Sequence, residues 1–242
     1  MQWNHLKWNW MHIGSLIPNS SSFLRVISGM RKRFSYRNVV KVNCRQSISR
    51  ITNEIGYPTH LVNVAGFSLV FLWFIGINKD GIFIKYKHND IQALIQTNLV
   101  GTMIVTQSVL PYMMKSKYGS IVNIGSVVGT GGRAGQSVYA ATKSALIGYS
   151  RSLAKEMGRY NVRVNVVAPG FIQTEMTQSI KDRDVLLNQI ALHRIGTVED
   201  VANTVSFLLS DAASYISGTV LHVDGGMEIW YVWIKHHSHI IH

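Results

Sequence analysis

The chain has 242 residues, of which 47% are hydrophobic and 15% are charged, and its single cysteine, Cys44, excludes an internal disulfide framework. This length and apolar content suit one α/β domain with a sizeable core. The net charge of +12 comes mostly from residues 1–53, which hold nine Lys and Arg and no Asp or Glu. Nucleic-acid binding is excluded, because no basic face interleaved with aromatic residues follows on a recognised module. No apolar run reaches the ~20 residues of a membrane-spanning helix.

Residues 1–53 form a basic, Ser-rich region that differs from the body of the chain at 54–227. Such a composition is typical of a mitochondrial transit peptide and predicts a protein of the mitochondrial matrix. The alternative is a disordered leader, which would leave a cytoplasmic location open. The tail at 228–242 is also atypical. It carries four histidines without Cys or carboxylate partners, so we expect no metal site there.

An apolar insert at 67–76 interrupts the body, and nearly all of its residues are hydrophobic. The run is about half the length that a bilayer requires. Extending it back to Leu61 brings in Asn63, whose side chain is costly in lipid. We therefore expect a buried strand or an aggregation-prone loop.

The body alternates predicted strands and helices. Strands are expected at 120–125, 162–168 and 218–223, and helices at 139–157 and from Thr197, where Asp200 completes a capping box. Strand–helix–strand units of this kind form right-handed crossovers, with helices on both faces of a parallel sheet. The expected fold is a Rossmann-like, doubly wound α/β sheet, and such sheets bind ligands beyond the carboxyl ends of their strands.

The strongest chemical signal is Tyr139 followed four residues later by Lys143, with Ser126 thirteen residues before the tyrosine. Positions i and i+4 share a helix face, so the ammonium is expected near the phenol. A tyrosine has a pKa near 10, and a neighbouring cation would lower it toward a value useful for proton transfer. Tyr139 is thus a candidate general acid toward a carbonyl oxygen, which Ser126 could hold by a hydrogen bond.

These residues lie in segments that resemble the short-chain dehydrogenase/reductase family, most of all its reductases of 3-oxoacyl groups on acyl-carrier protein and its mitochondrial carbonyl reductases. The likeness covers roughly 54–227 apart from the insert. It is carried by the Leu-Val-Asn-Val-Ala-Gly segment at 61–66, Ile-Asn-Lys-Asp-Gly at 77–81, Thr-Asn-Leu-Val-Gly at 97–101, the Ser126 segment at 119–129, Tyr-Ala-Ala-Thr-Lys at 139–143, the Ala-Pro-Gly segment at 165–174 and Val-Asp-Gly-Gly at 223–226.

The resemblance implies an NADP(H)-dependent oxidoreductase with the catalytic residues Asn98, Ser126, Tyr139 and Lys143. Asn98 would hold a water beside Lys143, and Lys143 would also bind the nicotinamide ribose. The further residues expected to contact the cofactor are Asn63, Gly66, Tyr139, Pro169, Gly170, Ile172 and Thr174. No metal is implied.

The main departure from the family pattern is that the Gly-rich phosphate loop cannot be found in this chain. Its closely spaced glycines belong on the first strand–helix turn, yet before Asn63 the chain has only Gly14, Gly29 and Gly56. The first strand–helix unit is therefore missing or degenerate. The segment at 38–44 resembles the third strand, with Arg45 where the family has an Asp. The glycines between 125 and 131 imitate the fingerprint but are better explained as the loop of the catalytic serine.

The resemblance implies reduction of a 3-oxoacyl-(acyl-carrier-protein) to its 3-hydroxyacyl form, as in fatty acid synthesis, with Tyr139 as the proton donor. A reductase of small carbonyls, quinones or steroids is the alternative within enzymes. A non-catalytic subunit of a hetero-oligomeric reductase is the alternative outside enzymes.

The family forms tetramers through helices near 90–115 and 138–158 and through the C-terminal strand. Acyl-carrier protein is acidic, so basic residues are expected at the entrance to the site. Lys117 stands at one of the family's positions for such a residue, and Tyr160 with Arg159 beside it stands at another.

Overall fold

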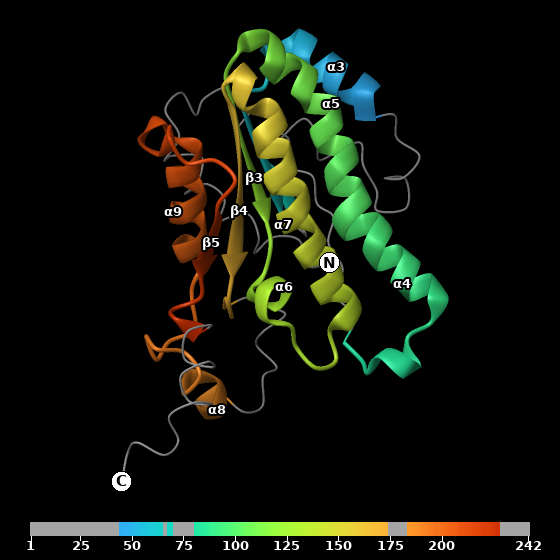
Figure 1. The fold of residues 1–242 in the computed structure, drawn as a ribbon, viewed down its shortest axis with the longest axis vertical. Coiled ribbons are helices and arrows are strands. Elements are labelled where there is room, and N and C mark those ends of the chain that lie inside the picture. The colour runs from blue at the N-terminus through green and yellow to red at the C-terminus, as the bar shows by residue number, and fades with distance from the viewer. Residues whose placement is uncertain (1–43, 65–66, 70–79, 174–182, 228–242) are drawn as a thin grey trace, which may run out of the picture.

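The computed structural model describes residues 44–64, 67–69, 80–173 and 183–227. In this part of the chain a five-stranded sheet has the order β2-β1-β3-β4-β5. Its strands are β1 (His60–Val64), β2 (Phe67–Leu69), β3 (Gly119–Ile124), β4 (Val162–Pro169) and β5 (Val220–Val223). The pairs β1–β3, β3–β4 and β4–β5 are parallel, as expected for a doubly wound sheet. Their carboxyl ends lie together at the lower edge of the sheet in Figure 1.

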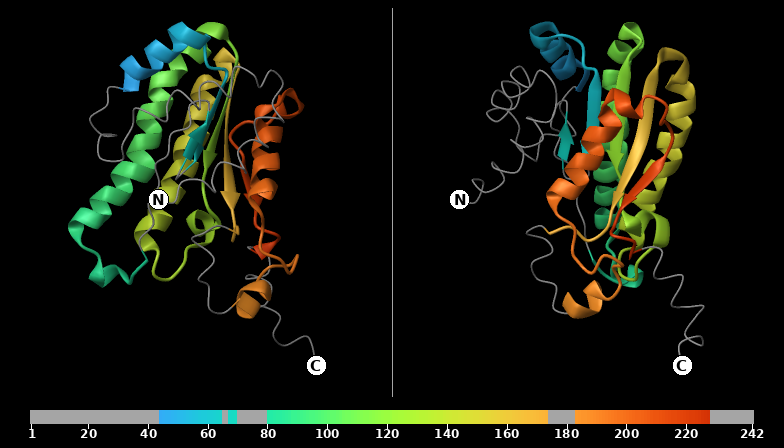
Figure 2. Two further views of the ribbon diagram at one scale, coloured as in Figure 1. Left: turned by 180° about the vertical axis from the view of Figure 1, so that it is seen from behind. Right: turned by 90° about the vertical axis from the view of Figure 1, so that its left-hand side faces the viewer.

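Helices cover both faces of the sheet (Figures 1 and 2). They are α3 (Cys44–Ile55), α4 (His88–Ile95), the π-helical segment η4 (Gln96–Val100), α5 (Gly101–Ser116), α6 (Val127–Gly131), α7 (Ser137–Met157), α8 (Arg183–Leu187) and α9 (Val198–Leu209). Three short 3₁₀ turns are η3 (Phe83–Lys85), η5 (Gly158–Tyr160) and η7 (Asp211–Ala213). The helices α3, α5 and α7 lie on one face, and α9 lies on the other, as the doubly wound fold requires.

Alternation along the strands divides the core into two clusters. In β3, the side chain of Ile121 packs toward α5 and α7, whereas that of Val122 packs toward α9. Leu61 and Val62 divide in the same way in β1. Successive side chains of a strand point to opposite faces, so a sheet covered on both sides needs apolar residues at consecutive positions. The nearly continuous apolar runs of these strands satisfy that need.

The insert adds a strand to the edge of the parallel sheet. Its first residues, Phe67–Leu69, form β2, which pairs antiparallel with β1 in the register Asn63–Ser68. The insert therefore adds an antiparallel edge strand to the sheet. The remainder of the insert, 70–76, lies outside the described residues.

The upstream boundary of the domain also differs from the sequence pattern. The helix α3 runs across the expected boundary between residues 53 and 54, and its Ile48 belongs to the core cluster beneath α5. Cys44 lies in this helix, whereas its resemblance to the third strand suggested the end of a strand. Residues 1–43, which include the segment at 38–43 and most of the basic N-terminal region, lie outside the described residues, as does the tail at 228–242.

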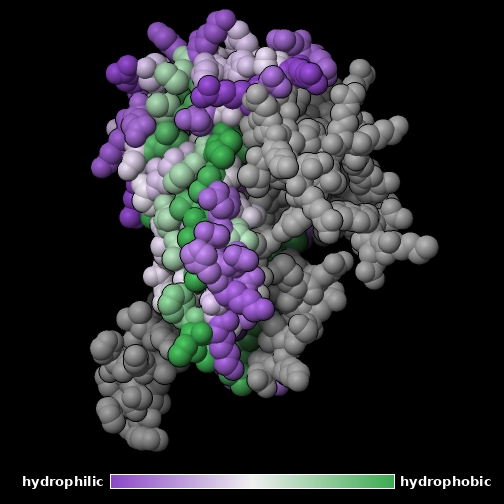
Figure 3. Space-filling model, turned by 90° about the vertical axis from the view of Figure 1, so that its right-hand side faces the viewer, coloured by the Kyte–Doolittle hydropathy of each residue, from purple (hydrophilic) through white to green (hydrophobic). Residues whose placement is uncertain are grey.

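The stretch His88–Ser116, which joins α4, η4 and α5, is the one helix in the described part that is long and apolar enough to cross a membrane. Core helices of globular proteins meet the same criterion. Val105, Val109 and Met113 of this stretch are buried in the core against the sheet. On the outer side of the molecule, a band of hydrophobic residues runs beside hydrophilic ones (Figure 3). The stretch does not by itself show a membrane span.

Candidate active site

Ser126, Tyr139 and Lys143 come together at the carboxyl edge of the parallel strands. Ser126 directly follows Gly125 at the end of β3 and caps α6, where its Oγ accepts a hydrogen bond from the Val128 N–H at 3.2 Å. Tyr139 lies in the first turn of α7, and Lys143 lies one turn later on the same helix. The Lys143 Nζ atom is 5.5 Å from the centroid of the Tyr139 ring. The structure therefore brings the three sequence-predicted residues together.

Glycine allows α6 to lie close against α7 at this point. A Cβ atom on Gly129 would come within 2.8 Å of the Lys143 Cβ atom and 2.9 Å of its carbonyl carbon. The Ser144 hydroxyl also donates a hydrogen bond to the Gly129 carbonyl. Glycine at 129 thus has a packing reason, because any larger residue would push α6 away from the Tyr–Lys helix.

Lys143 is almost completely enclosed, with 1% of its surface exposed. Its Nζ donates a hydrogen bond to the Ile124 carbonyl oxygen at 2.8 Å. Burial lowers the pKa of Lys143 to about 7, because the charged form loses its hydration. Near neutral pH this amine therefore gives up its proton far more easily than a surface lysine does.

The pKa of Tyr139 departs from the sequence expectation. Burial raises it above the ordinary tyrosine value, the hydrogen bond with Ser126 opposes that rise, and the charge of Asp80 adds to it. The expected lowering by Lys143 is not among the causes, because the Lys143 amine is itself desolvated and turned toward the Ile124 carbonyl. Tyr139 is held in its protonated form, which is the form that donates a proton.

Asn98 lies in the π-helical segment η4, and its side chain is fully buried. Its Nδ2 donates a hydrogen bond to the Thr142 Oγ1 at 3.3 Å, and that hydroxyl donates to the Tyr139 carbonyl oxygen at 2.7 Å. Asn98 therefore contacts the residue next to Lys143. Isolated π turns within α-helices occur often at functional sites, which agrees with a role for Asn98.

The expected cofactor residues are placed in part. Pro169 ends β4, the Gly170 N–H bonds the Val223 carbonyl oxygen at 3.0 Å, and Ile172 forms an isolated parallel bridge with Gly196. A Cβ atom on Gly170 would meet Asp224 at 2.8 Å, so the chain passes closely there. Gly66 and Thr174 lie outside the described residues.

Asn63 lies at the carboxyl end of β1, and its side chain forms hydrogen bonds in the protein interior. Its Nδ2 donates hydrogen bonds to the Asn123 Oδ1 at 2.8 Å and to the Thr106 Oγ1 at 3.0 Å. Asn123 in turn donates to the Ser150 Oγ at 2.8 Å. This buried network joins β1 and β3 to α5 and α7, so the Asn63 amide nitrogen is already used in packing.

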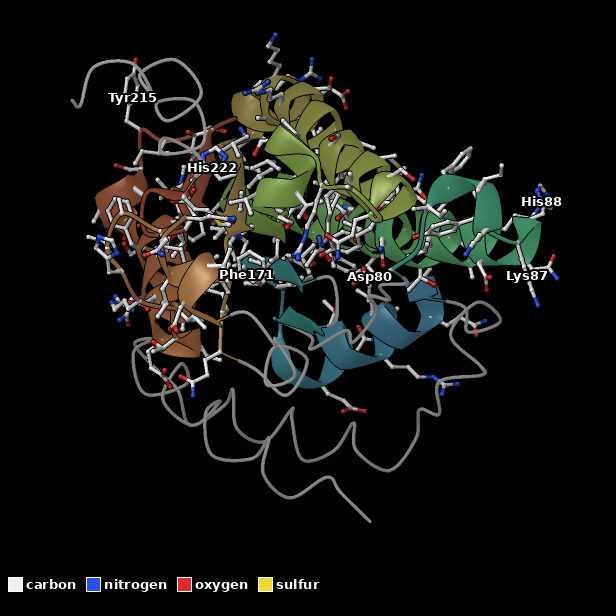
Figure 4. All side chains as sticks on the ribbon, turned by 90° about the horizontal axis from the view of Figure 1, so that it is seen from below. Asp80, Lys87, His88, Phe171, Tyr215 and His222 are labelled. Carbon is white, nitrogen blue, oxygen red and sulfur yellow. The ribbon has the colours of Figure 1, made fainter. Side chains whose placement is uncertain are left out.

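A cavity of about 520 Å³ lies beyond the end of β5. Phe171, Arg194, His222 and Asp224 are among its lining residues, whereas Ser126, Tyr139 and Lys143 are not. The Arg133 guanidinium stacks on the Phe171 ring at 5.0 Å. Figure 4 views this edge of the sheet and shows Phe171 and Asp80 near its middle. The cavity is therefore distinct from the group formed by Ser126, Tyr139 and Lys143.

The sequence did not indicate that Gln136 and Asp80 belong to the site. Gln136 stands at the N-cap position of α7 and bonds Asp80, whose charge acts on the Tyr139 phenol. Gln136 stands three residues before Tyr139, so shared helical spacing could have indicated it. Asp80 is remote in sequence, and only tertiary structure brings it here. Among the described residues no group of three His, Cys, Asp or Glu side chains could hold a metal ion.

The donor groups suit the nicotinamide half of a dinucleotide. Lys143 has three ammonium donors, of which one bonds Ile124, and the hydroxyls of Ser126 and Tyr139 lie at the same strand edge where such sheets bind ligands. Lys143, Pro169, Gly170 and Ile172 are the described residues that would hold that half. No described residue is assigned to the pyrophosphate.

Comparison with known proteins identifies the family. A family model described as enoyl-(acyl carrier protein) reductase matches residues 40–228. The chain is 42% identical over 187 residues to the 3-oxoacyl-(acyl-carrier-protein) reductase FabG of Thermotoga maritima, covering 76% of this chain and 72% of the relative. It is 44% identical over 185 residues to carbonyl reductase family member 4 of Xenopus tropicalis, covering 76% and 73%. It is 39% identical over 203 residues to a human 3-oxoacyl-(acyl-carrier-protein) reductase, covering 84% and 80%. With its doubly wound sheet and its Ser–Tyr–Lys group, the chain belongs to the short-chain dehydrogenase/reductase family of NAD(P)-dependent oxidoreductases.

Proposed function

We propose that the protein reduces a 3-oxoacyl group carried on acyl-carrier protein to the 3-hydroxyacyl group, with NADPH as the reductant. The observation that carries this proposal is the protonated, partly buried Tyr139 between Ser126 and Lys143 at the carboxyl edge of the sheet. The names of relatives from Thermotoga, human and Escherichia coli support the substrate and its carrier.

Ser126, Tyr139 and Lys143 have different roles in the reduction of the carbonyl group. The Ser126 hydroxyl donates a hydrogen bond to the carbonyl oxygen and fixes its position beside Tyr139. A nicotinamide held beside Lys143 would supply the hydride that the carbonyl carbon accepts. Tyr139 gives its phenolic proton to the oxygen, which completes the hydroxyl group, and the phenolate is then reprotonated from solvent through Lys143. A lysine pKa of about 7 suits this relay, because the amine can both accept and donate a proton near neutral pH.

Lys143, Pro169, Gly170 and Ile172 are proposed to contact the nicotinamide half of the cofactor, together with Tyr139 and Thr174. Asn63 and Gly66 remain predictions for the adenosine side. Choice of NADPH follows the resemblance to the acyl-carrier-protein reductases. A mitochondrial location, expected from residues 1–53, also remains a prediction.

Lys117 does not lie at the entrance of the site in this protomer. It is the C-cap of α5, before β3 begins, whereas Ser126 follows the end of that six-residue strand. At about 3.3 Å per residue, the length of β3 separates the two positions by roughly 20 Å. Lys117 lies at the amino ends of the parallel strands, and Ser126 lies at their carboxyl ends. Tyr160 and Arg159 lie at the same amino edge as Lys117, just before β4. Contact with a carrier through these residues would require a neighbouring copy. Reduction of small carbonyls, quinones or steroids is the alternative within enzymes.

A non-catalytic subunit is the second candidate function. It is favoured by the wide spacing of Gly14, Gly29 and Gly56, which does not form a phosphate loop. Assembly with an intact partner is proposed to use α4, α5 and α7, and the partly exposed Ile95 and Ile104 on the first two elements support this surface. A measurement of cofactor binding distinguishes the two candidates, because an active reductase must bind NADPH and a non-catalytic subunit need not.

The test of the proposed function is the substitution Tyr139→Phe, assayed with a 3-oxoacyl thioester and NADPH. We expect a loss of about 10²-fold or more in kcat with an unchanged unfolding temperature, because only the proton donor is removed. Tyr215→Phe is the matched control, since that side chain is fully exposed and distant in the fold. Retention of most activity in Tyr139→Phe would exclude Tyr139 as the donor.

A further inference from the structure

Asp80 and Gln136 form a contact at the start of the catalytic helix. The Gln136 Nε2 donates a hydrogen bond to the Asp80 Oδ1 at 2.7 Å. Beside it, the Gly81 N–H donates to the Gly135 carbonyl oxygen at 2.8 Å. These two bonds tie the segment at Asp80 to the turn from which α7 begins, so the position of that turn depends on both partners.

The carboxylate fixes the orientation of the Gln136 amide. A carboxylate only accepts hydrogen bonds, so it must face the amide nitrogen and leave the amide oxygen on the other side. Gln136 is 7% exposed, and its buried Oε1 has no hydrogen-bond partner among the described residues. A buried acceptor in this state is unfavourable and calls for an explanation beyond stability. Gln136 also forms no side-chain cap to α7, although it is the N-cap residue.

The pair lies where it can act on Tyr139. Gln136 and Tyr139 are three residues apart across the first turn of α7, and the Ala140 N–H bonds the Gln136 carbonyl oxygen at 2.7 Å. Burial is the first cause of the raised pKa of Tyr139, the bond with Ser126 opposes it, and the charge of Asp80 adds to it. Among the residues that the structure describes, Asp80 is the negative group whose charge favours the protonated phenol.

The other charged groups around α7 do not take this role. The elements α6 and η4, which pack against α7, carry no charged side chain. His88 and Asp90 of α4, Arg159 of η5 and Arg163 of β4 also belong to packed elements, yet none contributes to the shift of the phenol pKa. On α7 itself, Lys143 lies one turn beyond Tyr139 and bonds the Ile124 carbonyl.

We propose that Asp80 is a positioning residue for Tyr139, acting through its hydrogen bond to Gln136 and through its negative charge, so that the phenol is held in place as a proton donor. The proposal rests on the proposed reductase function and deepens it. Asp80 contacts neither substrate nor reacting atoms in this role. Asp80 thereby favours the reductive direction of the reaction. Reduction uses the protonated phenol of Tyr139, whereas the reverse oxidation uses the phenolate.

Two substitutions separate the bond from the charge. Asp80→Asn keeps an oxygen that can accept from Gln136 and removes the charge, so the pKa of Tyr139 should fall. Reduction needs protonated Tyr139, and therefore the alkaline loss of reductase activity should occur at lower pH in this variant. Gln136→Leu keeps the charge and removes the bond. It should lower kcat by about tenfold through misplacement of Tyr139 and should leave the alkaline limb of the pH profile unshifted.

The experiment titrates the phenol directly and does not depend on turnover. The full chain is labelled with carbon-13 at the tyrosine Cζ atoms, and the Tyr139 resonance is assigned by its loss in Tyr139→Phe. The pH dependence of that resonance is compared between the unmodified chain, Asp80→Asn and the control Asp184→Asn, an exposed carboxylate in α8 that does not act on Tyr139. Reductase pH profiles of the same proteins are recorded in parallel.

A lower titration midpoint in Asp80→Asn, with no change in Asp184→Asn, is the expected result. If that shift occurs in a chain without reductase activity, the positioning by Asp80 stands and the proposed function fails. If the chain is an active reductase and both the titration and the pH profile are unchanged in Asp80→Asn, the positioning is overturned and the function stands. An unfolding temperature within the range of the control confirms that Asp80→Asn remains folded.

Discussion

Lys143 is a fully buried side chain, and keeping its amine protonated in the folded chain costs stability. Its pKa falls from 10.5 to about 7 on folding, because burial removes the hydration of the ammonium. The unfolded chain therefore binds this proton more tightly than the folded one. The penalty is fully present below pH 7 and disappears as the pH rises toward 10.5. At about 1.4 kcal/mol per pKa unit, it amounts to about 5 kcal/mol.

Lys143→Met should consequently abolish activity and remove this rise of stability with pH. The measurement is the free energy of unfolding by denaturant at several pH values between neutral and alkaline. Lys155→Met is the matched control, since that lysine is exposed on the same helix. An unchanged pH dependence in Lys143→Met would contradict the assigned burial of the ammonium.

At the scale of elements, α9 shows how local sequence fixes a helix start. Thr197 accepts a hydrogen bond from the Asp200 N–H at 3.3 Å, and the Asp200 carboxylate accepts one from the Thr197 N–H at 2.7 Å. The Arg194 guanidinium binds the same carboxylate at 2.7 and 2.9 Å and, with the Thr197 N–H, holds its pKa well below the usual range. The capping box predicted from the sequence is thus confirmed.

Thr197→Ala should destabilise the protein by about 1 kcal/mol, because the N-cap acceptor is lost while the packing of α9 remains. Thermal or denaturant unfolding would measure it. Glu199→Ala is the control, an exposed residue of the same turn that makes no cap bond. Equal destabilisation by both substitutions would mean that the box adds nothing beyond helix propensity.

At the scale of the whole molecule, the catalytic residues and the expected phosphate site belong to different parts of the chain. The amides of a Gly-rich loop normally hold the pyrophosphate, and hydrogen bonds to charged groups contribute about 1.5–3 kcal/mol each. Without two or three of them, affinity should fall by several powers of ten, at about 1.4 kcal/mol per tenfold. We therefore expect weak NADPH binding by this chain in a calorimetric titration.

The control for that titration is a chain with a family-like first strand, Gly loop and helix in place of the N-terminal region and with residues 67–76 deleted. It should bind NADPH and turn over substrate. Micromolar affinity in the unmodified chain would show that residues 1–53 build a phosphate site by other means.

Much of the fold and the centre of the site could be predicted from local pattern. The apolar strands β3 and β4, the helix carrying Tyr139 and Lys143, and the capping box of α9 depend on residues close together in the chain. Their periodicity and side-chain chemistry are visible in the sequence. The i, i+4 spacing placed Lys143 one turn from Tyr139 without further information.

The tertiary structure decided what depends on contacts between distant segments. The enclosure of Lys143 by β3 and α6 sets its pKa, and the same burial raises the pKa of Tyr139, opposite to the effect expected from a charged neighbour alone. Asp80 meets Gln136 across 56 residues of sequence, and Lys117 lies at the far edge of the sheet. Desolvation and long-range electrostatics depend on how closely the layers pack, so sequence determined which groups the site contains, and packing determined their protonation and their partners.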